Sequence, residues 1–552
     1  MGKELRILFT SAGRRIELIQ AFRLDATRIH QPIRIYGTDL TKTAPALSFC
    51  DEAFQTCRIN NKDYIPTLIN ICKQNSVDLL VPTIDTDLLI LSQNKGLFKQ
   101  IGTNVLVSDK NVIEIANDKR NTCKFFNEVG VKTPETFDDF TKYNLGFPCF
   151  IKPMNGSASK DVHIVLGAKE LAHYADTIDD YIVQNLVEGE EFTVDVLCDL
   201  NHKPLYITPR KRVQVRSGEV IVTEIIDDPQ VVDECKKILQ NLQAIGPITI
   251  QYIKETTTGR NYYIEINPRF GGGSPLSMKA GAHSPEALLR IMQGETVKPQ
   301  LQVHSLGAIY SRFDQSVRVN PNFFTVSDLS ELHDKLEQYD AVIFDLDDTL
   351  YNELDYVKSG FKAVATITPQ TPNTFERLME YFAEGKVAID TLLNDSGNMS
   401  KHTKDACVRA YRDHKPDLKL TNEVKSLLIE LRKHGKKIGI ISDGRPIGQR
   451  TKIAALGIEE FVDEIIITDE LAGTSGDIMN FRKPNDTAFT LMQRRLGVAL
   501  DKMVYIADNT AKDFHACRSL GFDGIHYINK TGLHQPHKPN HDDRNKRGAA
   551  HA

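Results

Sequence analysis

Short apolar runs that alternate with amphipathic stretches fill two separate parts of this chain, and this feature constrains its fold more than any other. The first series covers residues 4–110, and the second begins at residue 341. Short apolar runs, each followed by a helical pattern, predict βαβ units and a parallel sheet. We therefore expect two α/β regions, each with a core of its own.

The part between these regions has a different pattern. Residues 203–275 favour antiparallel strands, and "GPITIQYIKETTTGRNYYIEINPRF" predicts a hairpin that turns at residues 256–259. We expect an α/β and α+β multidomain protein with the following parts: an N-terminal Rossmann-like α/β domain (1–110), a second domain (111–325), a linker (326–339), a Rossmann-like α/β domain (340–530) with an inserted helical cap (about 352–425), and a disordered polar tail (531–552).

The composition excludes several classes of protein. Of the 552 residues, 41% are hydrophobic and 26% are charged, and the formal net charge of −5 offers no basic surface for nucleic acid. No apolar run approaches the roughly 18 residues of a membrane helix, and the start lacks the apolar stretch of a signal peptide. The nine cysteines are scattered, without a C-x-x-C pair. We expect a cytoplasmic protein with reduced cysteines and no nucleic-acid or membrane partner.

Three carboxylates follow the apolar run "AVIF" at once: Asp345, Asp347 and Asp348. Carboxylates this close raise one another's pKa unless a cation or a reacting group balances them. A solvated cap on a following helix is the alternative explanation. The crowding predicts a site that binds a cation or transfers a charged group.

Three later segments support a site. "KIGIIS" ends on Ser442, "FRKPN" supplies Lys483, and "MVYIAD" ends on Asp508, with Asp513 beyond it. These positions lie where a parallel α/β sheet places its active site, outside the carboxyl ends of the strands.

The four segments, in this order, resemble the haloacid-dehalogenase phosphatases over about residues 340–530. The resemblance implies that Asp345 attacks phosphorus and forms an aspartyl-phosphate. It implies that Asp347 protonates the leaving oxygen and later activates water, and that Ser442 and Lys483 hold and neutralise the phosphoryl oxygens. We expect a phosphatase that hydrolyses phosphoric monoesters.

The same resemblance implies a Mg²⁺ site, with Mn²⁺ as an alternative cation. Asp508 would bind the cation with Asp345 and the backbone carbonyl of Asp347, hard oxygen ligands for a hard cation. Asp513 would orient that set of ligands or the lysine. The family more often has glycine where this chain has Ala507, but alanine is small enough for activity to be kept.

The first half has no Walker pattern and no G-x-G-x-x-G, but it carries another arrangement that suits a nucleotide. Glu265 and Asn267 lie two residues apart on one strand and face the same way. Gln251, on the preceding strand, can lie opposite Glu265 across the hairpin, and Arg269 comes next on that face. Three oxygen-bearing side chains and a guanidinium suit Mg²⁺ and phosphate. An exposed, alternating sheet face is the alternative.

These residues, together with "EINPRFGGGSPLS", resemble the ATP-grasp ligases, most nearly the carbamoyl-phosphate-synthase-like members, over about residues 1–320. The resemblance implies that Lys119 and Lys152 bind ATP, although either lysine could instead lie on the surface. It implies that a Gly/Ser loop with Gly156 and Ser157 covers the phosphates. The residues that it places along the nucleoside are Gln184, Leu186 and Val187 at the adenine edge and Glu191 at the ribose hydroxyls. The family often has glutamate where this chain has Gln184.

The acceptor side of this site has only candidate residues. Arg210, Arg212 and Arg216 in "PRKRVQVRSGE" suit a carboxylate or a phosphate, and a solvated charge run is the alternative. The strand ends "TSAGRR" and "VPTIDTD" are further candidates to line the acceptor.

We expect a bifunctional enzyme: an ATP-dependent carboxylate–amine ligase fused to a Mg²⁺-dependent phosphatase that acts on the ligase's substrate or product. The ligase would form an acyl phosphate, which an amine attacks, with Lys152 and Arg269 neutralising charge. The partners would be a small carboxylate, an amine and a phosphoester; a homodimer stays open. A nucleotide-binding module that regulates the phosphatase, or two unrelated activities in one chain, are the alternatives. The substrates and the order of the two reactions cannot be read from the chain.

Overall fold

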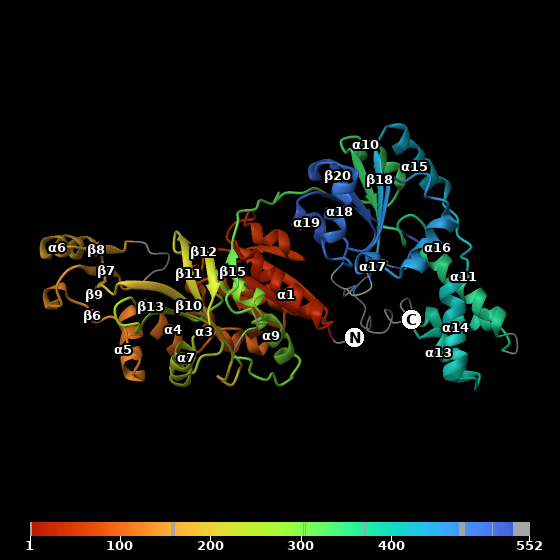
Figure 1. The fold of residues 1–552 in the computed structure, drawn as a ribbon. Helices are drawn as coiled ribbons and strands as arrows, with labels where there is room; N and C mark the ends of the chain where they lie inside the picture. Colours follow the sequence, from red (N-terminus) through yellow and green to blue (C-terminus); the bar gives the residue numbers. More distant parts are fainter. Residues whose placement is uncertain are drawn as a thin grey trace. The chain divides into compact units, whose positions relative to one another are not determined.

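The chain divides into two compact units, Met1–Ser316 and Val317–Ala552. The computed structural model describes residues 3–533 apart from 156–160, 302, 304, 369–370, 474–477, 479–480 and 511. The predicted tail beyond Leu533 therefore lies outside the described residues. Figure 1 shows sheets and helices in both units, and the expected α/β and α+β multidomain fold is confirmed.

The N-terminal sheet is parallel, as its sequence predicts, with strand order β3-β2-β1-β4-β5. Its central strands β1 and β4 are almost fully buried because helices cover both faces of a parallel sheet. The elements of this region are β1 (Leu5–Thr10), α1 (Ile16–Arg28), β2 (Ile33–Asp39), η1 (Pro45–Phe49), β3 (Glu52–Gln55), α2 (Tyr64–Gln74), β4 (Leu79–Pro82), α3 (Asp85–Gln100) and β5 (Asn104–Val105).

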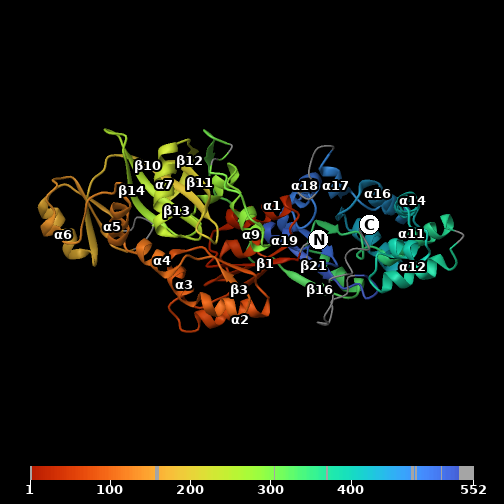
Figure 2. The same ribbon diagram turned by 90° about the horizontal axis from the view of Figure 1, so that it is seen from below.

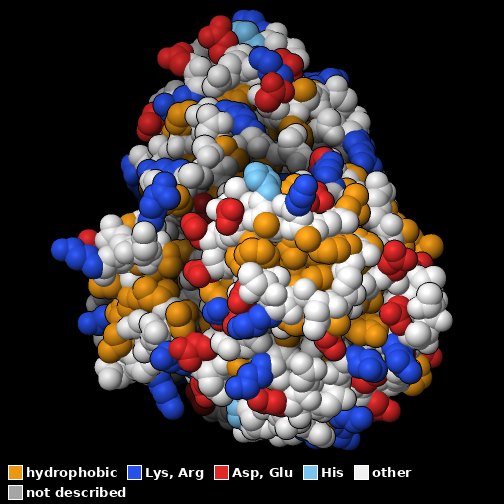
Figure 3. Space-filling view, turned by 90° about the vertical axis from the view of Figure 1, so that its left-hand side faces the viewer, with side chains coloured by type: hydrophobic (Ala, Val, Ile, Leu, Met, Phe, Trp, Pro, Cys, Tyr) orange, Lys and Arg blue, Asp and Glu red, His pale blue; other side chains and the backbone are white. Residues whose placement is uncertain are grey.

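A small antiparallel sheet of order β6-β9-β7-β8 follows. Helix α6 packs on one face, where Cys149, Ile151 and Val183 form a core. The other face carries the alternate residues of β7, Phe150 and Lys152. The elements are α4 (Lys110–Asn117), α5 (Lys119–Val129), β6 (Thr136–Phe137), η2 (Phe140–Lys142), β7 (Cys149–Pro153), β8 (His163–Val165), α6 (Ala168–Thr177) and β9 (Tyr181–Asn185). Figure 3 views this side of the molecule, where hydrophobic side chains gather between charged ones.

The largest sheet of the first unit is antiparallel, with order β14-β13-β10-β11-β12-β15. One face is apolar: Val194, Ile250 and Ile266 belong to a core that includes residues of α5 and α7. The predicted hairpin is β13 and β14, with its turn at residues 256–258. The elements are β10 (Gly189–Cys198), β11 (Pro204–Arg216), β12 (Glu219–Ile225), α7 (Pro229–Leu242), β13 (Gly246–Glu255), β14 (Asn261–Asn267), α8 (Ser274–Lys279), α9 (Ser284–Met292) and β15 (Ile309–Ser311).

The second unit is built on a parallel sheet of order β16-β21-β20-β17-β18-β19, with an apolar core on each face. The predicted second α/β region is therefore confirmed. The strands are β16 (Phe323–Val326), β17 (Ala341–Phe344), β18 (Lys437–Ser442), β19 (Glu464–Ile467), β20 (Met503–Ala507) and β21 (Asp523–Tyr527). The helices beside them are η3 (Leu329–Glu331), α10 (Leu332–Leu336), α15 (Asn422–Lys433), α16 (Pro446–Leu456), α17 (Thr468–Leu471), α18 (Thr487–Leu496), η5 (Leu500–Lys502) and α19 (His515–Leu520).

Four helices form the cap between β17 and β18: α11 (Glu353–Ile367), α12 (Thr374–Ala383), α13 (Ala388–Asp395) and α14 (Lys401–Asp413). They pack on one another, and Figure 2 shows α11, α12 and α14 grouped at one end of this unit. Helix α15 packs against β18 instead. The cap thus ends earlier than the expected residue 425.

The expected linker at 326–339 is wrong. Strand β16 pairs with β21, and Leu332, Leu336 and Tyr339 lie in the core of the second unit. The division falls at 316/317, before the expected end of the second domain at 325. The linker expectation missed strand β16 because its partner strand β21 lies about 200 residues further along the chain. No described helix is long and apolar enough to cross a membrane.

Candidate active sites

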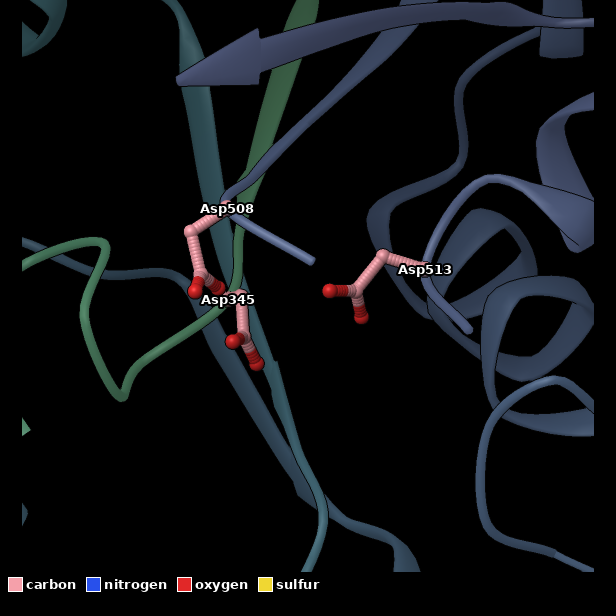
Figure 4. Close-up of side chains that lie close together, drawn as sticks. All are labelled: Asp345, Asp508 and Asp513. Atoms are coloured by element: carbon pink, nitrogen blue, oxygen red, sulfur yellow. The ribbon is translucent and has the colours of Figure 1, made fainter. Parts of the chain in front are cut away.

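The carboxylates of the second unit meet at the carboxyl edge of its sheet. Asp345 follows β17 and Asp508 follows β20, and these two strands are neighbours. Asp513, just before α19, points towards them from the other side (Figure 4). One carboxylate oxygen from each residue lies within 4.8 Å of the other two, and all three residues are buried. Adjacent parallel strands thus place residues far apart in the sequence in one cluster.

Lys483 supplies a fixed cation to this cluster. Its Nζ lies 2.6 Å from Asp345 Oδ1 and 2.7 Å from Asp513 Oδ1, and it donates to the Tyr505 hydroxyl at 2.9 Å. Burial alone would lower the pKa of Lys483, but the carboxylates of Asp345 and Asp513 raise it well above its ordinary value. The lysine is therefore held charged beside the expected nucleophile.

Lys483 alone does not balance the three carboxylates, and the nearby Lys512 offsets them only in part. Burial, with Asp513 adding to it and Lys483 opposing it, raises the pKa of Asp345 to about 6. Burial and the charge of Asp345 raise the pKa of Asp508 to about 9. Asp508 Oδ2 is buried and has no hydrogen-bond partner among the described residues. A divalent cation would stabilise the charged forms of Asp345 and Asp508 and give Asp508 Oδ2 a partner, so these residues fit Mg²⁺.

Ser442, the last residue of β18, is buried at the same edge, and its hydroxyl also has no partner among the described residues. A buried hydroxyl without a partner is costly unless a ligand completes its hydrogen bonds. Ser442 therefore fits the expected role of donating to a phosphoryl oxygen.

The side chain of Asp347 is held by a different set of residues. Lys452 Nζ lies 2.8 Å from Asp347 Oδ1, which also accepts from the Tyr351 hydroxyl, and Gln449 Nε2 donates to Oδ2 at 3.1 Å. Burial would raise the pKa of Asp347, but Lys452 and these donors lower it below its ordinary value. Without a ligand, Asp347 is thus an anion in an ion pair.

Sequence reasoning missed the three residues around Asp347. Gln449 and Lys452 lie three apart on α16, the helix that follows the Ser442 strand, and so share a helix face. That spacing beside a strand-end site is the signal that could have found them.

In the first unit, the polar face of the large sheet carries the expected residues in two rows. Gln251 lies opposite Glu265, as predicted, and Thr193 lies between Gln251 and Arg210 in the same row. The next row contains Asn267, Thr249, Asp195 and Thr208. Buried oxygens of Thr193, Asp195 and Thr208 have no partner among the described residues. This face is therefore built for polar ligands.

Two lysines lie near Glu265 in this unit. Lys119 begins α5, and its backbone N–H donates to the carbonyl of Met154, just after the strand of Lys152, at 3.2 Å. Burial lowers the pKa of both lysines; the charge of Lys119 lowers that of Lys152 further, and Glu265 partly opposes the change in each. Two close, half-buried ammonium groups suit an anion such as a polyphosphate. Gly156 and Ser157 lie outside the described residues.

The residues expected along the nucleoside differ in their surroundings. The side chain of Gln184 is buried and donates to Thr136 Oγ1 at 2.8 Å and to Cys123 Sγ at 3.4 Å. Gln184 pairs with Phe150 of β7 and therefore lies on the same face of the small sheet as Lys152. Leu186 is half-buried, Val187 is buried, and Glu191 is exposed and accepts from Arg212 Nε at 3.1 Å.

The arginines expected to grip the acceptor do not form one group. Arg210 is buried and donates to Asp195 Oδ2 at 2.8 Å. Arg216 lies at the far end of β11 in an exposed ion pair with Asp314. This exposed pair matches the alternative of a solvated charge.

The predicted loops "TSAGRR" and "VPTIDTD" do reach this region. Asp85, from the second loop, lies 2.5 Å from Arg269 Nη2. Arg15, from the first loop, lies near Arg269. Burial and the charge of Arg269 lower the pKa of Arg15 to about 10. Sequence spacing could not show the Asp85–Arg269 pair, since its members come from different sheets.

Comparison with known proteins assigns the second unit. Residues 342–526 match the family model described as haloacid dehalogenase-like hydrolase. The glyceraldehyde 3-phosphate phosphatase of Methanopyrus kandleri is 30% identical over 217 residues, which are 37% of this chain and 89% of that protein. The chain belongs to the haloacid dehalogenase-like hydrolases. The predicted resemblance is thus confirmed for this unit.

The first unit of this haloacid dehalogenase-like hydrolase matches other models. Residues 7–106 match the PylC-like N-terminal domain, and residues 177–314 match ATP-grasp in the biosynthetic pathway with Ter operon. The carbamoyl-phosphate synthase of Methanobrevibacter smithii is 24% identical over 222 residues, 37% of this chain and 60% of that protein. A solved biotin carboxylase domain of Hydrogenobacter thermophilus 2-oxoglutarate carboxylase covers 54% of this chain and 72% of its own, with 17% identity and a TM-score of 0.45.

The chain is therefore an enzyme with an ATP-grasp ligase-like region and a haloacid dehalogenase-like phosphatase region. In the phosphatase region, a surface hollow of about 430 Å³ lies along the edge strand β19, lined among others by Arg450, Glu464 and Arg495. None of the site residues described above lines it. The chemistry of this hydrolase belongs to the strand ends rather than to this hollow.

Proposed function

We propose that the chain is a bifunctional enzyme. Its first unit is an ATP-dependent carboxylate–amine ligase, and its second unit is a phosphatase that removes a phosphate from the ligase's substrate or product. The observation that carries the proposal is the buried cluster of Asp345, Asp508 and Asp513 beside the fixed cation Lys483. The polar face of the large sheet supports the ligase assignment of the first unit.

In the phosphatase, Asp345 attacks phosphorus and forms an aspartyl-phosphate. Asp347, which takes up a proton when the phosphoester binds, gives that proton to the leaving oxygen. Ser442 and Lys483 donate hydrogen bonds to the phosphoryl oxygens, where negative charge collects. Asp347 then takes a proton from the water that hydrolyses the aspartyl-phosphate. Asp345, Asp508 and the carbonyl of Asp347 would hold Mg²⁺, which would neutralise negative charge at the phosphoryl group.

In the ligase, ATP phosphorylates a carboxylate, and an amine attacks the acyl phosphate to form an amide. Lys119 and Lys152 bind the phosphates of ATP, and Arg269 neutralises the transferring group. Gln251, Glu265 and Asn267 supply oxygen ligands for Mg²⁺ on the polar sheet face. Arg212 and Glu191 lie on the same side of β10 and β11 and border the nucleotide.

The relatives support these reaction classes. One group is named for the hydrolysis of glyceraldehyde 3-phosphate, which supports a small phosphoester as the substrate of the second unit. Another is named for carbamoyl-phosphate synthesis, which supports acyl-phosphate chemistry in the first. Fusion gives the second site an effective concentration of the intermediate of order ~mM, which favours reactions in series.

The test measures each activity in the full chain. With Mg²⁺, wild type should hydrolyse p-nitrophenyl phosphate, and Asp345→Asn, which removes the nucleophile at constant size, should not. With ATP and a mixture of small carboxylates and amines, wild type should form ADP. A wild type that is inactive towards phosphoesters, or an Asp345→Asn variant as active as wild type, would refute the phosphatase assignment.

A further inference from the structure

The third carboxylate of the catalytic loop, Asp348, does not join the other carboxylates. Its Oδ1 accepts the backbone N–H of Glu353 at 2.8 Å, at the start of the cap helix α11. Its Oδ2 accepts the backbone N–H of Leu533 at 2.6 Å. Asp348 is 1% exposed. Both carboxylate oxygens are thus used to tie the loop to two other parts of the unit.

The chain beyond the last strand of the sheet returns to the same loop. Asn529 Nδ2 donates to the carbonyl of Asp348 at 3.0 Å and to Asn352 Oδ1 at 2.7 Å, and Thr531 Oγ1 donates to Asn352 Oδ1 at 3.0 Å. Leu533 packs against the apolar core of the unit. We call residues 529–533 the C-terminal clasp.

The clasp fits closely against Asp348. A methyl group placed on Gly532 would lie 2.9 Å from Asp348 Cγ and 3.1 Å from each carboxylate oxygen. Contacts this short are below van der Waals distance, so a side chain at residue 532 would push the clasp and the carboxylate apart. The glycine is needed here for close approach rather than for an unusual backbone angle.

The backbone of Asp348 explains why the loop needs support. Its φ is 53°, in the left-handed region that L-residues with a side chain rarely adopt. Such a conformation costs about 1 kcal/mol or more and persists only where its surroundings hold it. Asp348 follows Asp347 directly, so the same conformation sets where the carboxylate and the carbonyl of Asp347 point.

We propose that Asp348 and the C-terminal clasp are positioning elements for Asp347 in the phosphatase reaction. This role rests on the proposed phosphatase function. Asp348 holds the left-handed turn from one side through Glu353, and the clasp holds it from the other. The clasp thus completes the phosphatase active site, although residues 529–533 contribute no group to the chemistry.

The test compares four variants of the full chain with p-nitrophenyl phosphate and Mg²⁺. Asp348→Gly tolerates the left-handed backbone and removes only the carboxylate; Asp348→Asn keeps one acceptor oxygen. Gly532→Ala keeps every hydrogen-bonding group and adds only the methyl group. Asp355→Asn, an exposed carboxylate in the first turn of α11, is the matched control.

Misplacing a reacting group by about 1 Å lowers rates by up to about 100-fold. At saturating Mg²⁺, we expect kcat to fall about ten- to hundred-fold in Asp348→Gly and Gly532→Ala, with the KM for the phosphoester within about two-fold of wild type. Asp348→Asn should lie between these variants and wild type, and the control should match wild type. Amide hydrogen exchange in residues 346–353 should become faster in both impaired variants.

Unchanged kcat in Asp348→Gly and Gly532→Ala would overturn the proposal. Full recovery of kcat at saturating Mg²⁺ would overturn it too, because Asp348 would then act only on the cation. If Asp348→Gly does not fold, Gly532→Ala and Asn529→Ala decide by the same criteria. If wild type itself hydrolyses no phosphoester, the proposed function fails, whereas faster exchange in Gly532→Ala still establishes the clasp.

Discussion

The two catalytic sites are built on opposite charge balances. The phosphatase site has three buried carboxylates around one lysine, an excess of negative charge that a cation relieves. The ligase site has two half-buried lysines near Glu265, an excess of positive charge that an anion relieves. The first site comes from one edge of one sheet, and the second from a helix and two sheets. The contrast indicates that one site is organised mainly by its sheet and the other by its ligand.

The comparison predicts that the two chemistries can be removed separately. Asp345→Asn should lower p-nitrophenyl phosphate hydrolysis by at least about 10³-fold, because the nucleophile is lost, and should leave ADP formation unchanged. Glu265→Gln, which removes a charge at constant shape, should abolish ADP formation and leave the hydrolysis unchanged. Both rates are measured on the same preparations. Cross-effects in either direction would show that the sites depend on each other.

The corrected boundary predicts that the second unit folds alone only with its first strand. A fragment of residues 317–552 should be soluble and hydrolyse p-nitrophenyl phosphate. A fragment of residues 335–552 lacks β16 and the buried Val326 and Leu332, which destabilises it by about 3 kcal/mol or more, and it exposes the edge of β21. Urea unfolding and sedimentation compare the two. Equal stability of both fragments would support the expected linker at residues 326–339 rather than the division at 316/317.

The unbalanced carboxylates predict a stability that depends on pH and on Mg²⁺. Asp508 has a pKa raised to about 9, so between its ordinary pKa and pH 9 the folded state binds more protons than the unfolded state. The stability of the metal-free second unit should therefore fall as pH rises through this range. Mg²⁺ should raise the melting temperature at pH 8 more than at pH 5, by about 2–4 °C for each kcal/mol gained.

Calorimetry with and without a chelator measures this dependence. Asp508→Asn is the matched variant, since it removes the charge and keeps the size. The stability of this variant should depend less on pH, and its melting temperature should no longer respond to Mg²⁺. An equal Mg²⁺ response in this variant would place the cation elsewhere.

The smallest effect is expected at the exposed end of β11. Arg216→Ala removes only a surface ion pair, and such pairs contribute about 0–1 kcal/mol. It should change ADP formation by less than about two-fold, whereas Arg212→Ala should raise the KM for ATP about ten-fold because it removes a cation beside Glu191. Steady-state kinetics on both variants decide. A large loss of ADP formation in Arg216→Ala would support the expected role of Arg216 in binding the acceptor.

The sequence predicted best what depends on local pattern. Asp345, Ser442 and Asp508 follow apolar runs, and the ends of parallel strands meet at one edge, so their neighbourhood could be anticipated. The register of Gln251 and Glu265 followed from the length of one hairpin. Both cases need only periodicity and a short loop.

The remainder depends on packing between distant segments. Gln449 and Lys452, two of the partners of Asp347, come from α16, and β16 pairs with β21, so both contacts join segments far apart in the chain. Gln184 lies on the expected strand, but its amide donates to Thr136 and Cys123, which no local pattern indicates. Such choices are set by the neighbouring side chains rather than by the strand's own sequence.

The central claim is that the two reactions act in series on one molecule. The most direct measurement incubates wild type and Asp345→Asn with ATP, Mg²⁺ and a metabolite extract and compares the new products by mass spectrometry. We expect the variant to accumulate an amide that is heavier than the wild-type product by one phosphoryl group. Identical products in mass and yield from both proteins would contradict the account.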